Sequence, residues 1–148
     1  MSSAHSMSSI AAMSVASAGQ SSPRFLRRAL AADAIVSGAV GLLMITGAGM
    51  LSALLGLDRA LLLGGGLVLV PFVALVGWLA TRDRPASGGV SLAIAANVLW
   101  ALACAGLWFA SATGAGAPAT LLGEAFIALH IVTVLAFAAL EFIGLRLA

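Results

Sequence analysis

Four polar side chains that could bind a proton or a ligand interrupt the apolar stretches of this sequence: Asp33, Asn97, His130 and Glu141. An ionisable side chain at the centre of a membrane helix costs about 2.5 to 3.5 kcal/mol on insertion scales, so each one needs an explanation. If both segments are helical, Asp33 lies about 7.5 Å beyond Arg28. Glu141 lies a similar distance before Arg146. The two carboxylates are predicted to pair with Arg27, Arg28 or Arg146 near the headgroups, with Asn97 holding a helix–helix contact. In the alternative interpretation, the three groups form a proton- or ligand-binding pocket open to the cytoplasm.

His130 lies near the middle of the last apolar stretch and on the same helical face as Glu141. Their separation corresponds to three turns, or about 16.5 Å, which is suitable for two polar side chains that line one path through the membrane. In the alternative interpretation, His130 is a neutral core residue bonded to a nearby carbonyl or hydroxyl, with Thr133 one turn away. No second His or Cys stands at ligand spacing, so the sequence predicts no metal and no haem. Cys104 is the single cysteine, which excludes an intramolecular disulfide.

The composition is that of an integral membrane protein. Hydrophobic residues make up 62% of the chain and charged residues 8%, whereas about a quarter of the residues in a soluble domain are charged. All basic residues are arginines, and they are scattered without interleaved aromatic residues. The sequence therefore excludes nucleic acid as a partner and predicts the lipid bilayer as the main one.

The apolar stretches predict an all-α, up-down four-helix transmembrane bundle. The predicted spans are residues 25–46, 60–81, 90–110 and 120–145, connected by short turn-rich loops. Residues 51–57 are apolar but too short to span, which predicts a short helix at the membrane interface or against the bundle. Residues 1–23, rich in Ser, Ala and Met, are predicted to be a disordered tail, and residues 24–148 the transmembrane domain.

The arginines predict the orientation of the bundle. Six of them fall on one side of a four-span topology: Arg24, Arg27, Arg28, Arg82, Arg84 and Arg146. The opposite side holds Arg59 alone. By the positive-inside rule, both termini are cytoplasmic.

A weak internal repeat relates the two halves of the chain. A shift of 64 residues places Asp33 on Asn97 and Arg82 on Arg146. The repeat would be a parallel duplication of a helical hairpin. Chance similarity between Ala-rich segments is the competing explanation.

The segments AANVLWALA (residues 95–103) and ALEFIGLR (residues 139–146) resemble a family of small, uncharacterised four-helix proteins of the bacterial inner membrane. Members of that family carry an acidic residue early in the first span, as Asp33 is here. The chain is also loosely similar in architecture to DoxX-like proteins. The resemblance implies the fold and a bacterial inner-membrane location, and it adds no activity.

These observations predict a non-enzymatic accessory or structural subunit of a larger membrane complex, without catalytic residues or cofactors. The alternative is a small-molecule or proton-linked transporter subunit acting as an oligomer. For the transporter, His130→Ala and Glu141→Gln are expected to abolish flux. For the accessory subunit, bulky residues at Gly38 or Gly65 are expected to disrupt association with other subunits or with a second copy.

Overall fold

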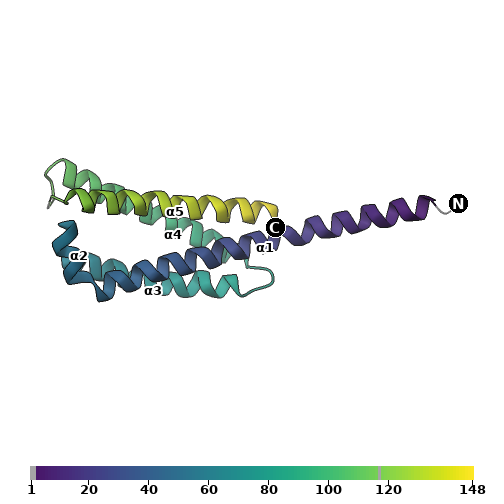
Figure 1. The fold of residues 1–148 in the computed structure, drawn as a ribbon, viewed down its shortest axis with the longest axis horizontal. Coiled ribbons are helices and arrows are strands. Elements are labelled where there is room, and N and C mark those ends of the chain that lie inside the picture. Colours follow the sequence, from purple (N-terminus) through teal and green to yellow (C-terminus); the bar gives the residue numbers. More distant parts are fainter. Residues whose placement is uncertain (1–2, 117) are drawn as a thin grey trace.

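The computed structural model describes residues 3–116 and 118–148, with side chains from Pro23 onward. Over these residues the chain folds into five helices: α1 (Ser3–Thr46), α2 (Ala48–Leu55), α3 (Arg59–Ala80), α4 (Ser87–Ala112) and α5 (Leu121–Leu147). Figure 1 shows the four long helices running antiparallel to their neighbours in sequence, which confirms the predicted all-α bundle. The chain is a membrane protein by this architecture.

Four helical segments are long and apolar enough to cross a membrane: Pro23–Thr46, Arg59–Ala80, Ser87–Ala112 and Leu121–Leu147. Their bounds differ from the predicted spans by at most three residues. This agreement has a physical basis, because about 20 apolar residues are needed to cross the hydrocarbon core as a helix. The polar turns between the stretches then mark where each helix must end.

Helix α1 extends well before its membrane-spanning part. It is continuous from Ser3, and its N-terminal portion projects beyond the bundle in Figure 1. The sequence predicted a disordered tail over residues 1–23; residues 1–2 lie outside the described part, and from Ser3 onward the structure is helical instead. Alanine favours helix, and a helix already formed in the bundle can propagate backwards one residue at a time.

The short apolar stretch after the first span forms α2, eight residues that pack against α3 and α5. Its Ala48, Leu51 and Leu55 side chains are buried, so the helix lies against the bundle as predicted. Gly56 ends α2 with φ of 70°, a left-handed conformation that an L residue rarely adopts. Asp58 then caps α3, its carboxylate accepting from the backbone N–H groups of Ala60 and Leu61.

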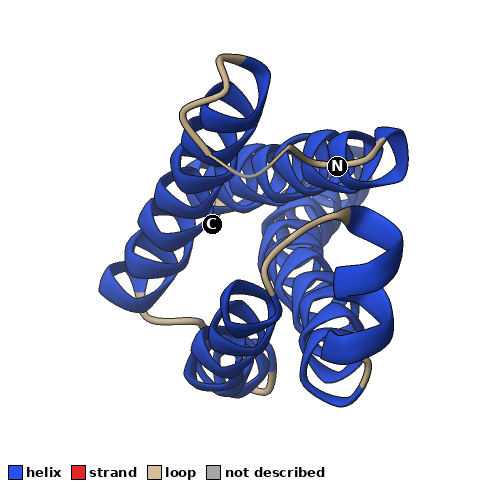
Figure 2. Cartoon of the chain, turned by 90° about the vertical axis from the view of Figure 1, so that its left-hand side faces the viewer, coloured by secondary structure: helices blue, strands red, loops and turns tan. Residues whose placement is uncertain are grey.

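The four long helices form a ring when the bundle is seen along its length (Figure 2). Going around the ring, α1 packs against α3, α3 against α4, α4 against α5, and α5 against α1. Helices α1 and α4 therefore face each other diagonally. The contact between α3 and α4 is the least extensive of the four.

Gly38 and Gly65, the two glycines singled out in the sequence, pack against neighbouring helices of the bundle. A Cβ on Gly66 would lie 2.9 Å from the carbonyl oxygen of Gly41, so α1 and α3 approach closely here. A Cβ on Gly65 would lie 2.8 Å from Met44 Cε, and one on Gly38 would lie 3.5 Å from Val73 Cγ1. Gly38 and Gly65 thus face neighbouring helices of the same chain. These positions serve internal packing, and the effect of bulky residues there on association stays a prediction.

The burial pattern follows the predicted shift of 64 residues only over the first helix of each hairpin, so the internal repeat stays a prediction. With the shift of 64 residues, four buried positions of α1 fall on four buried positions of α4: Leu26 on Val90, Ala29 on Ala93, Asp33 on Asn97, and Ser37 on Ala101. With a shift one residue longer, α3 matches α5 in the same way: Leu62 on Ile127, Leu69 on Val134, Val76 on Glu141, and Leu79 on Gly144. The ring order is also compatible with a two-fold relation between the hairpins α1–α3 and α4–α5.

Candidate functional site

Asp33 is the centre of a buried polar cluster in the middle of the bundle. Its side chain is 0% exposed. One carboxylate oxygen accepts a hydrogen bond from Ser37 Oγ at 2.7 Å, and the other accepts one from Asn97 Nδ2 at 2.8 Å. Ser37 lies one turn further along α1, where residues four apart share a face. Both oxygens of Asp33 are therefore satisfied within the bundle.

The bond between Asp33 and Asn97 links the two diagonal helices. Their backbones are too far apart for close packing, so side chains must fill the centre of the ring. An aspartate on α1 and an asparagine on α4 meet there as acceptor and donor. In an apolar surrounding such a bond holds the register of two helices, and its loss leaves a buried donor without a partner.

Glu141 brings a third helix into the polar cluster. It is 0% exposed and neighbours Asp33 and Asn97 from α5. Nevertheless, neither carboxyl oxygen has a hydrogen-bond partner among the residues with described side chains. The cluster therefore contains one fully bonded carboxyl group and one unbonded carboxyl group.

Apolar side chains close the polar cluster at both ends. Toward the arginine-rich end lie the buried residues Leu26, Leu30, Val76, Leu79, Val90 and Ala93. Toward α2 lie the buried residues Met44, Ala48, Leu51, Leu55, Leu57, Leu62, Leu69 and Ile127. The predicted opening of the pocket to one side of the membrane is not present in this conformation.

His130 is separate from this cluster. Between it and Glu141 on the buried face of α5 lie Val134 and Ala138. The His130 Nδ1 atom is 2.9 Å from the carbonyl oxygen of Phe126, and the two rings are tilted by 51° with their centroids 4.3 Å apart. The partner of His130 is therefore a backbone carbonyl one turn back rather than Thr133. Of the four residues singled out in the sequence, the structure brings Asp33, Asn97 and Glu141 together.

The arginines have partners other than the buried carboxyl groups. Arg27 donates to the carbonyl of Ala80 at 3.1 Å and forms an exposed ion pair with Asp83 at 3.3 Å. The Arg146 guanidinium lies over the Phe142 ring, 4.9 Å from its centroid. Pairing of Asp33 with Arg27 or Arg28 is thus wrong, because Asp33 is bonded to Ser37 and Asn97 instead.

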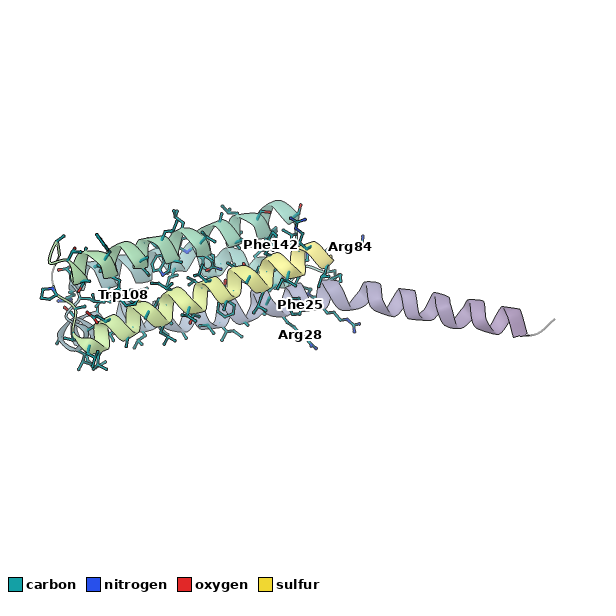
Figure 3. The ribbon with its side chains drawn as sticks, turned by 90° about the horizontal axis from the view of Figure 1, so that it is seen from above. Phe25, Arg28, Arg84, Trp108 and Phe142 are labelled. Atoms are coloured by element: carbon teal, nitrogen blue, oxygen red, sulfur yellow. The ribbon has the colours of Figure 1, made fainter. Side chains whose placement is uncertain are left out.

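Figure 3 shows how the charged and aromatic residues are distributed along the bundle. Arg28 and Arg84 lie at one end, near Phe25 and Phe142, and Trp108 lies near the other end. This placement follows the antiparallel course of the helices. It places the charged loop between α3 and α4 at the end of the bundle that is nearer to the polar cluster.

Sequence reasoning missed two residues. Ser37 bonds Asp33, and its position four residues later in a helix was the available signal. Trp100 shares a cavity with His130, which a single sequence does not indicate. Among the residues with described side chains, no group of three or more His, Cys, Asp or Glu is placed to hold a metal ion. Comparisons with protein-family models, curated proteins and solved structures gave no match to this chain.

Proposed function

We propose that this protein is a non-enzymatic accessory or structural subunit of a larger membrane complex. The observation that carries the proposal is the closure of the polar cluster. Asp33, Asn97 and Glu141 are at most 2% exposed and lie between two apolar groups of side chains. The hydrogen bond between Asp33 and Asn97 holds two of the four long helices in register. Polar side chains of this kind serve a small bundle as helix contacts.

The outer surface offers a place where another membrane helix could pack. Gly64 on α3 and Gly106 on α4 have no atom within 4 Å of where a Cβ would stand, so they face outward. Large apolar residues around them, including Leu67 and Leu102, are more than half exposed. Outward glycines allow two helices to approach closely, and the partner is a different membrane subunit or a second copy of this chain.

The test is association of the tagged protein after gentle extraction from its own membrane, measured by native mass spectrometry. We expect Gly64→Leu or Gly106→Leu to remove a defined partner while the bundle stays folded. Gly88→Leu is the matched control, because Gly88 is equally open but lies in the first turn of α4. A complex that keeps its full composition in both variants would contradict these faces as the contact. A monomer in the unmodified protein would contradict the accessory role itself.

A proton-linked transporter subunit acting as an oligomer is the second candidate, and Glu141 favours it. A buried carboxyl group without a partner beside a second carboxyl group is the arrangement expected of a site that takes up and releases a proton. The two groups of apolar side chains that close the polar cluster would then have to open alternately to the two sides of the membrane. Asp33 and Asn97 would hold the site, and His130 would lie further along the path.

The transporter is tested by proton flux into liposomes that contain the purified protein and a pH-sensitive dye. Glu141→Gln is expected to abolish flux while the protein still inserts. Glu124→Gln makes the same chemical change on α5, at a partly exposed position in its first turn, and should leave flux unchanged. Equal flux in all three proteins would exclude Glu141 as the carrier.

We further propose that the protein lies in a bacterial inner membrane with both termini in the cytoplasm, as the resemblance and the arginines imply. The arginine-rich loop between α3 and α4 and the C-terminal Arg146 support this orientation. A fluorescent protein fused after Ala148 should then fluoresce in the cytoplasm. A dark fusion that is fully translocated would reverse the orientation.

A further inference from the structure

A cavity of about 230 Å³ lies where the ring of helices is least tightly packed. Leu62 and Gly65 line it from α3, Trp100 and Cys104 from α4, and His130 from α5. The looser contact between α3 and α4 forms its membrane-facing side. Leu61, which also lines it, is 46% exposed on the outer surface. A molecule dissolved in the lipid could therefore enter sideways between these two helices.

Two polar atoms of the residues that line this cavity are buried without a partner. They are Nε1 of Trp100 and Nε2 of His130. The indole Nε1–H is a donor only. In the neutral imidazole, Nδ1 must carry the hydrogen in order to donate to the Phe126 carbonyl, which leaves Nε2 as an acceptor. The same two residues also line a neighbouring cavity of about 120 Å³.

A hydroxyl group supplies both functions that these atoms lack. Its oxygen can accept from an indole N–H, and its hydrogen can be donated to an imidazole nitrogen. The remaining lining residues named above are apolar or weakly polar, so the rest of the ligand must be apolar. The volume exceeds the roughly 150 Å³ of an apolar cavity that holds benzene, so a ring with a substituent fits.

We propose that this cavity binds a lipid-soluble, ring-sized molecule that carries a single hydroxyl group, anchored by Trp100 and His130. The two unpartnered atoms point to this chemistry, because leaving a buried donor and a buried acceptor unbonded is unfavourable in both bundle and lipid. The site is distinct from the Asp33 cluster. It stands whether the protein is an accessory subunit or a transporter.

The experiment uses fluorescence quenching in lipid nanodiscs with the full-length chain. Trp78→Phe and Trp108→Phe together leave Trp100 as the only tryptophan. The probes are 4-bromophenol and 4-bromotoluene, which have nearly the same shape and differ by a hydroxyl in place of a methyl group. Bromine quenches a tryptophan that it contacts. We expect saturable quenching by 4-bromophenol with a dissociation constant roughly tenfold lower than that of 4-bromotoluene.

His130→Phe in the same background should remove most of this preference for the phenol. The unmodified protein provides a second measurement, since its melting temperature should rise more with 4-bromophenol than with 4-bromotoluene at equal concentration. Saturable binding with equal affinity for both probes would overturn the proposal, because the cavity would then be a purely apolar space. Quenching that rises linearly with both probes would also overturn it, because such quenching reports partition into lipid.

Discussion

Replacing Glu141 with methionine is expected to raise the free energy of unfolding by about 2 kcal/mol, although Glu141 belongs to the polar cluster. Both of its oxygens are buried and unbonded, so the folded bundle carries their desolvation cost without a compensating hydrogen bond. Methionine has a similar length and volume and carries no strongly polar atom. Reversible unfolding in mixed detergent micelles, followed by helical circular dichroism, measures the change.

Asp33→Ala is the matched comparison, and it should change stability in the opposite direction. Its loss leaves the Asn97 amide and the Ser37 hydroxyl without their shared acceptor, which should lower the free energy of unfolding by about 2 kcal/mol. Removing one or the other carboxyl group of the cluster is thus expected to change the free energy of unfolding in opposite directions. A Glu141→Met protein that is less stable than the unmodified one would show that Glu141 has a partner in the folded protein.

Gly123→Ala is expected to destabilise the protein by about 3 kcal/mol. A Cβ at this position would overlap the carbonyl oxygen of Leu55, the last residue of α2. That oxygen already accepts from the Thr120 N–H at 2.9 Å, and Thr120 Oγ1 donates to the carbonyl of Leu54 at 2.8 Å. The added methyl group must therefore separate α2 from the start of α5 and break these bonds. Thermal unfolding in detergent measures the loss.

Gly64→Ala is the control for this change, because it inserts the same methyl group where no atom lies within 4 Å. There the gain in helix propensity should leave stability unchanged or raise it by up to about 1 kcal/mol. The comparison separates steric overlap from propensity. Equal effects at both positions would contradict the close contact between α2 and α5.

The four membrane-spanning helices were predictable because the membrane imposes a length and a polarity that a single sequence displays directly. The meeting of Asp33 and Asn97 was only partly predictable. Their similar depth followed from counting residues, but their contact depends on α1 and α4 being diagonal, which no local pattern reveals. The predicted pairing of Asp33 with nearby arginines was wrong for the same reason. Arg27 precedes Asp33 in α1, but its guanidinium binds the Ala80 carbonyl and Asp83 of neighbouring segments.

His130 illustrates the limit more clearly. Helical spacing predicted that His130 and Glu141 share one face of α5, because the spacing of residues within a single helix fixes which of them lie on the same face. Its neighbours Trp100 and Phe126 come from tertiary packing and from the turn before it. The position of α2 was predictable as a short apolar segment. The contact with Gly123, some 70 residues later in the chain, was not.

The hydrogen bond between Asp33 and Asn97 joins two positions that the predicted shift of 64 residues places on each other. In a symmetric dimer of one hairpin, the residue on the axis faces an identical residue. Two aspartates would then repel each other as anions, and two asparagines would present no charge at all. A single chain that contains both hairpins can place an acceptor on one side of the axis and a donor on the other. Covalent linkage of the halves is what allows this bundle to place an acceptor opposite a donor at its centre.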